Sequence, residues 1–319
     1  MLMDKKIYFA PLEGITSYIF RNAFSGIYGH VDKFFTPFIS PAEKSPMTPR
    51  ERKDVLPENN AGTNLVPQIL TNRSDFFIEA AKELHSMGYS EVNLNLGCPS
   101  GTVCAKGKGA GFLPETLALQ EFLDDIYTYA ASDNIKISIK TRLGYYDPDE
   151  FHDLLEIFNK FPVSELIVHP RIRSDFYKGE PRKEYFAYAI EHSKNPLVYN
   201  GNIYTCKDYE SLANEFGAGL DPVMLGRGLI TDPSLADKLN GLAAETDFAK
   251  FRKLHDTVYH EYQKALSPDI NVLYKMKELW SYWQNLFDGC ERDFKRMLKA
   301  KKCAEYEEAV DRIFQTKGV

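Results

Sequence analysis

The sequence predicts an α/β fold, namely a (β/α)8 TIM barrel followed by a small C-terminal α-helical bundle. Eight short apolar runs rich in β-forming residues recur up to residue 228, and amphipathic helical patterns lie between most of them. Strands that alternate with helices in this way form a parallel sheet. Eight such units within about 240 residues match the size of a closed barrel. Beyond residue 248 the helical periodicity continues without strands, which predicts the bundle.

The predicted strands begin near Ile7, Asp32, Leu65, Glu91, Lys136, Glu165, Pro196 and Pro222. Helices are expected at residues 74–87, 114–131, 149–161, 183–192 and 205–216, and then at 248–266, 271–287, 291–301 and 305–315. A doubly wound sheet is the alternative architecture, but no G-x-G-x-x-G turn follows the first strand. We therefore expect a catalytic barrel at residues 1–240, a linker at 241–247 and a helical domain at 248–319.

Charge and cysteine content narrow the class of protein. The 319 residues carry a net charge of −6, so a nucleic acid would have to bind a local basic patch. The five cysteines have no C-x-x-C or other metal-type spacing, which suits reduced thiols in a cytosol. The first residues lack the apolar segment of a signal peptide, and no stretch is long enough to span a bilayer. We expect a cytoplasmic protein without a membrane or metal partner. The sequence does not set the oligomeric state, for which a monomer is the expectation.

Polar or glycine residues stand at the carboxyl ends of seven of the eight predicted strands. Active sites of such barrels are built at these ends. The residues are Gln68, Asn95 with Cys98, Lys140 with Arg142, His169 with Arg171, Asn200-Gly201-Asn202, Gly226-Arg227-Gly228 and, after the first strand, Ala10-Pro11-Leu12-Glu13. Any one of them has an ordinary structural explanation, but a folded core does not require the whole ring. The ring therefore predicts a cofactor and substrate site.

The stretch from Asn93 to Val103 carries the most specific pattern. Apolar and polar residues alternate up to Leu96, and Gly97 and Pro99 then end the strand, which places Cys98 where a loop begins. The glycine- and lysine-rich segment 101–111 has a composition suited to a mobile lid. A buried structural thiol before a turn is the alternative reading of Cys98, and the polar ends of the other strands count against it.

Asn95-x-Gly97-Cys98-Pro99-x-x-x-Val103, followed by a glycine-rich turn, resembles the signature of the tRNA-dihydrouridine synthases. These are flavin (FMN) enzymes that reduce a uracil ring in tRNA. The resemblance covers nearly the whole chain and is densest at the strand ends. It implies an FMN-dependent reduction of a D-loop uridine to 5,6-dihydrouridine, with NADPH or NADH as reductant, hydride from flavin N5 and a proton from Cys98. A thiol is protonated at neutral pH and can act as a general acid.

The resemblance also implies roles for the other strand-end residues. The FMN contacts would come from Ala10, Pro11, Leu12, Gln68, Lys140, His169, Asn200, Gly201, Asn202, Gly226 and Arg227. The last five lie after strands seven and eight, where barrels commonly hold phosphate. Asn202 stands where the family usually has an acidic residue. A Schiff-base role for Lys140, as in barrel aldolases, is the alternative, but it explains neither the phosphate loops nor Cys98.

The expected substrate contacts in the barrel are Asn95, Arg142, Arg171 and Arg173. The stretch that carries the last two departs from the family pattern at Pro170 and Phe176, and it lacks the acidic-aromatic pair that often follows Gly179. An FMN barrel that acts on a small molecule, such as a dihydroorotate dehydrogenase or an old yellow enzyme, is the main alternative. It would share Lys140 and the phosphate loops. A catalytically dead RNA-binding barrel is the third reading, against which Cys98 and Lys140 argue.

The helical domain resembles the part of the family that grips tRNA, and its signature matches Lys275-Met276-Lys277-x-x-Trp280, so Lys275 and Lys277 are expected to contact the substrate. From residue 247 onward there are 14 Lys or Arg against 12 Asp or Glu, while the rest of the chain has 25 against 33. Arg292, Lys295, Arg296 and Lys299 recur at steps that place them on one helical face. A solvated face is the alternative, but these cations lie in the domain to which the catalytic interpretation gives no other task. A small-molecule enzyme would also have no use for a basic helical bundle. These four residues are therefore expected to contact tRNA phosphates.

Overall fold

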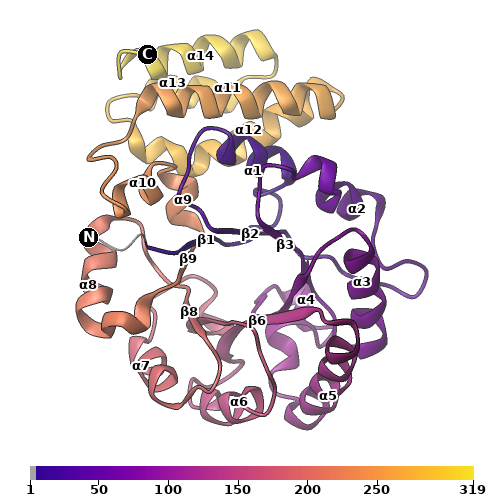
Figure 1. Cartoon of the computed structure of the whole chain (residues 1–319). Coiled ribbons are helices and arrows are strands. Elements are labelled where there is room, and N and C mark those ends of the chain that lie inside the picture. Colours follow the sequence, from indigo (N-terminus) through magenta and orange to yellow (C-terminus); the bar gives the residue numbers. More distant parts are fainter. Residues whose placement is uncertain (1–4) are drawn as a thin grey trace.

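The computed structural model describes residues 5–319 and forms a barrel of parallel strands with helices around it (Figure 1). The strands are β1 (Ile7–Phe9), β2 (Lys33–Phe35), β3 (Leu65–Val66), β4 (Gln68–Ile69), β5 (Glu91–Leu96), β6 (Lys136–Gly144), β7 (Leu166–Ile172), β8 (Leu197–Tyr199) and β9 (Val223–Leu225). Their order is β3-β2-β1-β9-β8-β7-β6-β5-β4, with every pair parallel. The predicted fold class is confirmed.

The third predicted strand is split into β3 and β4 at Pro67. Proline has no backbone N–H to donate to a neighbouring strand, so the ladder is interrupted there. The two halves nevertheless join different neighbours, because β3 pairs with β2 and β4 pairs with β5. Counted as one strand, β3 and β4 close the barrel and restore the predicted number of eight.

The side chains that face the interior of the barrel are apolar on one side and polar on the other. Inward-facing side chains of β1, β2, β3, β7, β8 and β9 form an apolar cluster, made of Tyr8, Ala10, Phe35, Val66, Ile167, Val198 and Met224. The corresponding positions of β4, β5 and β6 are polar and buried, among them Gln68, Asn93 and Ser138. Because side chains alternate along a strand, the apolar residues Val92, Leu94 and Leu96 of β5 face the surrounding helices instead.

The helices of the barrel match the predicted ones closely. They are α1 (Tyr18–Ser25), α2 (Pro49–Val55), α3 (Ser74–Ser86), α4 (Gly101–Cys104), α5 (Thr116–Asp133), α6 (Glu150–Phe158), α7 (Lys183–His192), α8 (Cys206–Phe216), α9 (Arg227–Thr231) and α10 (Leu235–Leu239). The five short ones, α1, α2, α4, α9 and α10, were not expected from periodicity. They have eight residues or fewer, too few turns for an amphipathic pattern to stand out.

The C-terminal region consists of α11 (Phe248–Ala265), α12 (Asp269–Trp283), α13 (Glu291–Lys299) and α14 (Cys303–Gln315), with a 3-10 turn at Gln284–Leu286. In Figure 1 these helices lie beside α1, α9 and α10 at one side of the barrel. The indole N–H of Trp283 donates to the carbonyl of Ile230 (2.9 Å), and one hydrophobic core runs continuously from the barrel into these helices. The domain boundary at residues 240–248 therefore stays a prediction.

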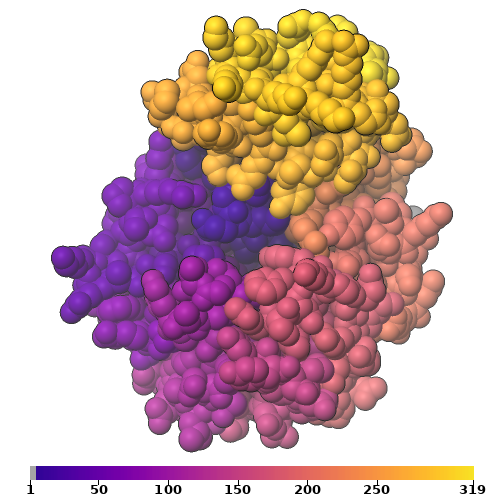
Figure 2. Space-filling view, turned by 180° about the vertical axis from the view of Figure 1, so that it is seen from behind, coloured from indigo at the N-terminus to yellow at the C-terminus, as the bar shows by residue number. Residues whose placement is uncertain are grey.

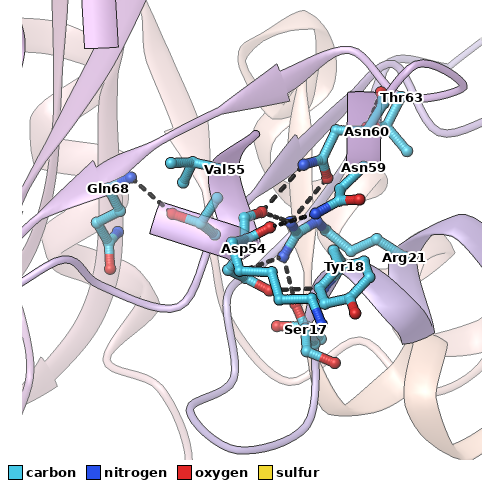
Figure 3. A network of polar contacts seen from close by, with 12 residues as sticks. Ser17, Tyr18, Arg21, Asp54, Val55, Asn59, Asn60, Thr63 and Gln68 are labelled. Carbon is cyan, nitrogen blue, oxygen red and sulfur yellow. Dashed lines mark hydrogen bonds and ion pairs between the residues drawn. The ribbon is translucent and has the colours of Figure 1, made fainter. Parts of the chain in front are cut away.

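A buried arginine anchors the loop that follows β1 (Figure 3). Arg21 on α1 donates to the carbonyl of Thr16 (2.6 Å), to the carboxylate of Asp54 (3.0 Å) and to the side chain of Asn60 (2.8 Å). The Asp54 carboxylate also accepts from the backbone N–H of Tyr18 (2.6 Å). Removal of one partner of a buried ion pair costs about 3–5 kcal/mol. This network therefore fixes the loop from residue 12 to residue 18 against α2.

Candidate active site

A cavity of about 480 Å³ opens at the carboxyl ends of the strands. Thirteen of the residues predicted from the sequence line it: Ala10, Pro11, Leu12, Gln68, Asn95, Cys98, Lys140, Arg142, His169, Asn200, Gly201, Gly226 and Arg227. Figure 2 shows a hollow with N-terminal residues at its bottom, between the C-terminal helices and the central part of the chain. The volume lies in the range of cofactor and ligand pockets.

A chain of buried amides connects the polar side of the barrel interior to the cavity. Asn93 donates to the hydroxyl of Ser138 (3.0 Å) and accepts from Gln68 (2.7 Å), and Gln68 in turn accepts from Asn95 (2.7 Å). The side-chain oxygen of Asn95 accepts from the backbone N–H groups of Gly97 (3.0 Å) and Cys98 (2.9 Å). The predicted substrate residue Asn95 thus holds the loop that carries Cys98.

Cys98 is a half-buried thiol at the edge of the cavity. Burial raises its pKa above the ordinary value, so the sulfur remains protonated at neutral pH. Gly109, which has a φ of +58°, packs directly against it; a Cβ at this position would lie 2.9 Å from the carbonyl oxygen of Cys98. The Cys104 thiol donates to the same carbonyl (3.4 Å). The segment predicted as a lid is therefore folded beside Cys98, as α4 and the 3-10 turn Gly109–Phe112, and its closure stays a prediction.

Cationic side chains dominate the floor of the cavity. Burial, assisted by the charge of Arg142, lowers the pKa of Lys140 to about 7. Burial also lowers the pKa of Arg142, to about 10, which leaves it charged at neutral pH. The ammonium of Lys140 has no hydrogen-bond or ion-pair partner among residues 5–319. A buried ammonium without a protein partner, beside a second cation, fits an anionic ligand.

Arg142 reaches three backbone carbonyls. Its guanidinium donates to Gly97 (2.9 Å), Ile172 (3.0 Å) and Phe176 (2.7 Å). These bonds tie the Cys98 loop to the segment after β7. The predicted contact between Arg142 and the substrate stays a prediction, whereas the role in holding the two loops is directly visible.

His169 and Arg171 form a pair inside β7. The guanidinium of Arg171 lies 2.9 Å from Nε2 of His169, and because a guanidinium can only donate, this nitrogen must be the acceptor. Burial and the surrounding cations hold the pKa of His169 well below its usual value, so the ring is neutral. Its Nδ1–H is then the donor. Arg171 is fully buried and also donates to the carbonyls of Lys178 and Gly179, so it orients His169.

The loops after β8 and β9 meet at Arg227. Its guanidinium donates to the side chain of Asn202 (3.1 Å), and it lies over the rings of Tyr177 (4.7 Å) and Tyr204 (5.5 Å). Gly201 has no room for a side chain, because a Cβ would lie 2.3 Å from the hydroxyl of Tyr199. Gly201, Gly226 and Arg227 all line the cavity, which is the combination of glycines and a guanidinium that a phosphate site uses.

The other predicted substrate residues lie outside the cavity lining. Arg173 lies over the rings of Tyr145 and Phe176, at 5.4 and 5.3 Å. The ammonium of Lys275 donates to the carbonyl of Gly14 (2.7 Å), and that of Lys277 donates to the carbonyl of Ala300 (2.5 Å). Lys275 thereby joins α12 to the loop after β1. Direct binding of a substrate by these residues stays a prediction.

The predicted basic face exists on α13. Arg292, Lys295, Arg296 and Lys299 line a shallow surface concavity together with Glu291. Arg296 forms an exposed ion pair with Asp293 on the same helix (3.4 Å). Exposed pairs of this kind contribute little to stability, so the cations stay available to a polyanion.

Four cavity-lining residues were missed by the sequence reasoning: Pro37, Phe38, Glu278 and Tyr282. The first two follow β2, the one strand whose end was not predicted to contribute to the site. Glu278 and Tyr282 belong to α12, where their one-turn spacing is indistinguishable from that of any helical face. Only the packing of α12 on the barrel brings them to the cavity.

Metal ligands and membrane-spanning helices are two further features that would bear on function. In the described part of the chain, no group of three or more His, Cys, Asp or Glu residues is placed to hold a metal ion. Within residues 5–319, none of the helices has the length and apolar character needed to cross a membrane.

The family model described as dihydrouridine synthase (Dus) matches residues 8–317. A probable tRNA-dihydrouridine synthase of Staphylococcus epidermidis is 29% identical over 264 residues, which cover 80% of this chain and 78% of that protein. Probable tRNA-dihydrouridine synthase 2 of Bacillus subtilis is 27% identical over 264 residues, with coverages of 80% and 78%. Among solved structures, a variant of NCR from Zymomonas mobilis has a TM-score of 0.53 at 14% identity and covers 76% of this chain and 88% of that chain, which supports the barrel fold alone.

Proposed function

The chain belongs to the dihydrouridine synthase family, and from this premise we propose that it reduces a uridine in the D-loop of tRNA to 5,6-dihydrouridine with FMN and NADPH or NADH. The single observation that carries the proposal is the joint placement of Cys98, Lys140, His169 and Arg227 around one cavity. The family's relatives with this name supply the substrate class.

The residues of the cavity fit FMN. Its phosphate would bind at Gly201, Gly226 and Arg227, where two glycines and a guanidinium line the cavity. The isoalloxazine would lie against Ala10, Pro11 and Leu12. Gln68 would face its polar edge, although the oxygen of Gln68 already accepts from Asn95 and its amide donates to Asn93. A second proton on the Gln68 amide remains for a ligand.

Lys140 and His169 suit the part of a flavin that becomes negative. An anion close to Lys140 would raise the pKa of that ammonium from about 7 and keep it charged. The neutral His169 offers its Nδ1–H, because Nε2 is taken by Arg171. When bound, FMN would supply the hydride for the C5–C6 bond of uracil.

Cys98 would supply the proton. Its raised pKa keeps the sulfur protonated at neutral pH, so the thiol can act as a general acid without a neighbouring base. Hydrogen bonds from the N–H groups of Gly97 and Cys98 to Asn95 fix the loop that presents it. The carbonyl of Cys98 accepts from the N–H of Ala110 (3.1 Å), which closes the turn on the other side.

The test is direct. The protein, reconstituted with FMN, is incubated with NADPH and tRNA transcribed without modifications, and the nucleosides are analysed by mass spectrometry. A mass gain of two hydrogens at a D-loop uridine is expected. Release of FAD on denaturation, or no flavin retained after reconstitution, would contradict the cofactor. Turnover of free pyrimidines with none of tRNA would instead favour a small-molecule reductase.

A further inference from the structure

One wall of the cavity comes from the C-terminal helices. Glu278 and Tyr282, one turn apart on α12, line the same cavity as Cys98 and Lys140. The helix is fixed against the barrel at two points: Lys275 donates to the carbonyl of Gly14 (2.7 Å), and Trp283 donates to that of Ile230 (2.9 Å). The side chains of this wall therefore have defined positions relative to the reacting groups.

Only one of the two oxygens of the Glu278 carboxylate accepts a hydrogen bond from the protein. Oε2 accepts from Lys275 at 3.1 Å, whereas Oε1 has no donor anywhere in residues 5–319. The side chain is 45% exposed, which places it towards the mouth of the cavity. A carboxylate with one free oxygen at a cavity wall is an acceptor for a ligand O–H or N–H.

The charge of this wall limits which part of a nucleotide it can meet. The cations Lys140, Arg142 and Arg227 come from the barrel strands and the segments that follow them, while Glu13 and Glu278 line the cavity as acids. Each of these acids has one cation beside it, Arg50 at 3.7 Å from Glu13 and Lys275 at 3.1 Å from Glu278, so this wall has no excess positive charge to attract a phosphate. The remaining donors of a uridine are the imide N–H of the base and the hydroxyls of the ribose. Since the base must reach Cys98, the ribose stays nearer to the mouth, where Glu278 is exposed.

We propose that Glu278 accepts a hydrogen bond from the 2′-hydroxyl of the target uridine and makes the reaction specific for a ribonucleotide. This inference rests on the proposed function. A carboxylate that binds a ribose hydroxyl is a well-established arrangement in nucleotide-binding folds, and the 2′-hydroxyl is the group by which a protein distinguishes RNA from DNA at one position. Lys275 is then a positioning residue, because it holds both Glu278 and the loop at Gly14.

The experiment compares three tRNAs that differ only at the D-loop uridines, which carry 2′-hydroxyl, 2′-deoxy or 2′-fluoro sugars. The fluoro sugar keeps the ribose-like pucker but cannot donate. The wild-type holoenzyme should reduce the 2′-hydroxyl tRNA with a kcat/KM about tenfold or more above both analogues, as expected for a hydrogen bond to a charged acceptor. In Glu278→Ala this preference should fall to near one. Because the preference is a ratio measured on one protein, a change in the fraction folded cancels.

Glu121→Ala, at an exposed glutamate on α5, is the matched control and should keep the wild-type preference. Equal reduction of all three tRNAs by the wild type overturns the inference and leaves the proposed function intact. A 2′-fluoro tRNA that reacts as well as the ribose form also overturns it, since the sugar pucker would then be what is read. If Glu13→Gln loses the preference and Glu278→Ala keeps it, Glu13 is the residue that accepts from the 2′-hydroxyl and the assignment to Glu278 is wrong. Reduction of none of the three would instead contradict the proposed function.

Discussion

The barrel and the C-terminal helices each contain a network of hydrogen-bonded polar side chains, and the two networks end on different groups. In the barrel, the network runs from the Ser138 hydroxyl through side-chain amides to Asn95, which accepts from the backbone N–H of Cys98 at the cavity. In the helices, the indole of Trp280 donates to the hydroxyl of Tyr306 (2.9 Å), which lies 2.7 Å from Nε2 of His255. This second network ends on the carboxylate of Asp256, which lies next to His255 on α11. The end of each network, rather than its burial, therefore indicates its role.

The helical network is closed in itself. Nδ1 of His255 lies 2.8 Å from Asp256, whose carboxylate is also paired with Arg252 (2.9 Å). Burial lowers the pKa of His255, so the neutral ring donates from Nδ1 and accepts from Tyr306 at Nε2. Every member has a partner, and aromatic rings pack around the group. This network is expected to contribute to stability and not to chemistry.

The largest expected effect is at the end of the barrel network. Cys98→Ala should keep its flavin and its reduction by NADPH, but reduce tRNA about 10²–10⁴-fold more slowly, because a general acid is removed. Single-turnover reduction of tRNA by the prereduced enzyme measures this step. Cys104→Ala, whose thiol only bonds the Cys98 carbonyl, should be much milder. An equal loss in both variants would place the acid elsewhere.

The comparison between the networks predicts a split between activity and stability. Asn95→Ala removes the acceptor for two N–H groups that hold Cys98, so kcat should fall about 10²-fold through misplacement of the thiol. His255→Phe leaves polar partners unsatisfied and should cost about 1–3 kcal/mol of stability, with kcat near the wild-type value. Urea unfolding and kcat, measured on both variants, test this. A helical variant with intact stability and greatly reduced activity would contradict the assignment.

Lys140 gives the barrel a pH dependence above pH 7, whereas the lowered pKa of His255 affects the stability of the helices only below its ordinary value of 6.5. The folded pKa of Lys140 is about 7 against an ordinary 10.5, so without an anion the folded protein binds fewer protons than the unfolded chain between these values. Stability therefore rises with pH through this window, and the penalty is fully present below pH 7. Flavin-free Lys140→Met should melt a few degrees above the wild type near pH 7, and the difference should shrink towards pH 10.5. Thermal scans across this range give the answer, and a variant that melts lower at pH 7 would refute it.

The smallest expected effect is on the exposed face of α13. Neutralising Arg292, Lys295, Arg296 and Lys299 together should weaken tRNA binding and flatten its salt dependence, with the log–log slope reduced by about 1 for each phosphate that is no longer neutralised. NADPH oxidation should not change, since the barrel is untouched. Four cations near the amino ends of the strands, Lys6, Lys136, Lys160 and Lys194, form the matched control. Filter binding at several salt concentrations measures both variants. Equal salt slopes for the two would show that the α13 face does not contact tRNA phosphates.

Local patterns determined much of this protein. The strand starts and the long helices were predicted to within a few residues, because side-chain periodicity follows directly from backbone geometry. The break at Pro67 also has a local cause, although it was not predicted. The residues that end the strands were found for the same reason: in a parallel barrel all carboxyl ends lie on one face, so residues that follow successive strands in the sequence become neighbours in space.

Only the tertiary structure decided what these neighbours do to one another. The sequence names Asn95, Arg142 and Arg171, but it does not show that their polar atoms hold the Cys98 loop, the segment after β7 and His169. Such bonds depend on backbone carbonyls and N–H groups, which are the same in every residue and carry no sequence signal. The contribution of Glu278 and Tyr282 was equally hidden, because the packing of α12 on the barrel arises from contacts far apart in the chain.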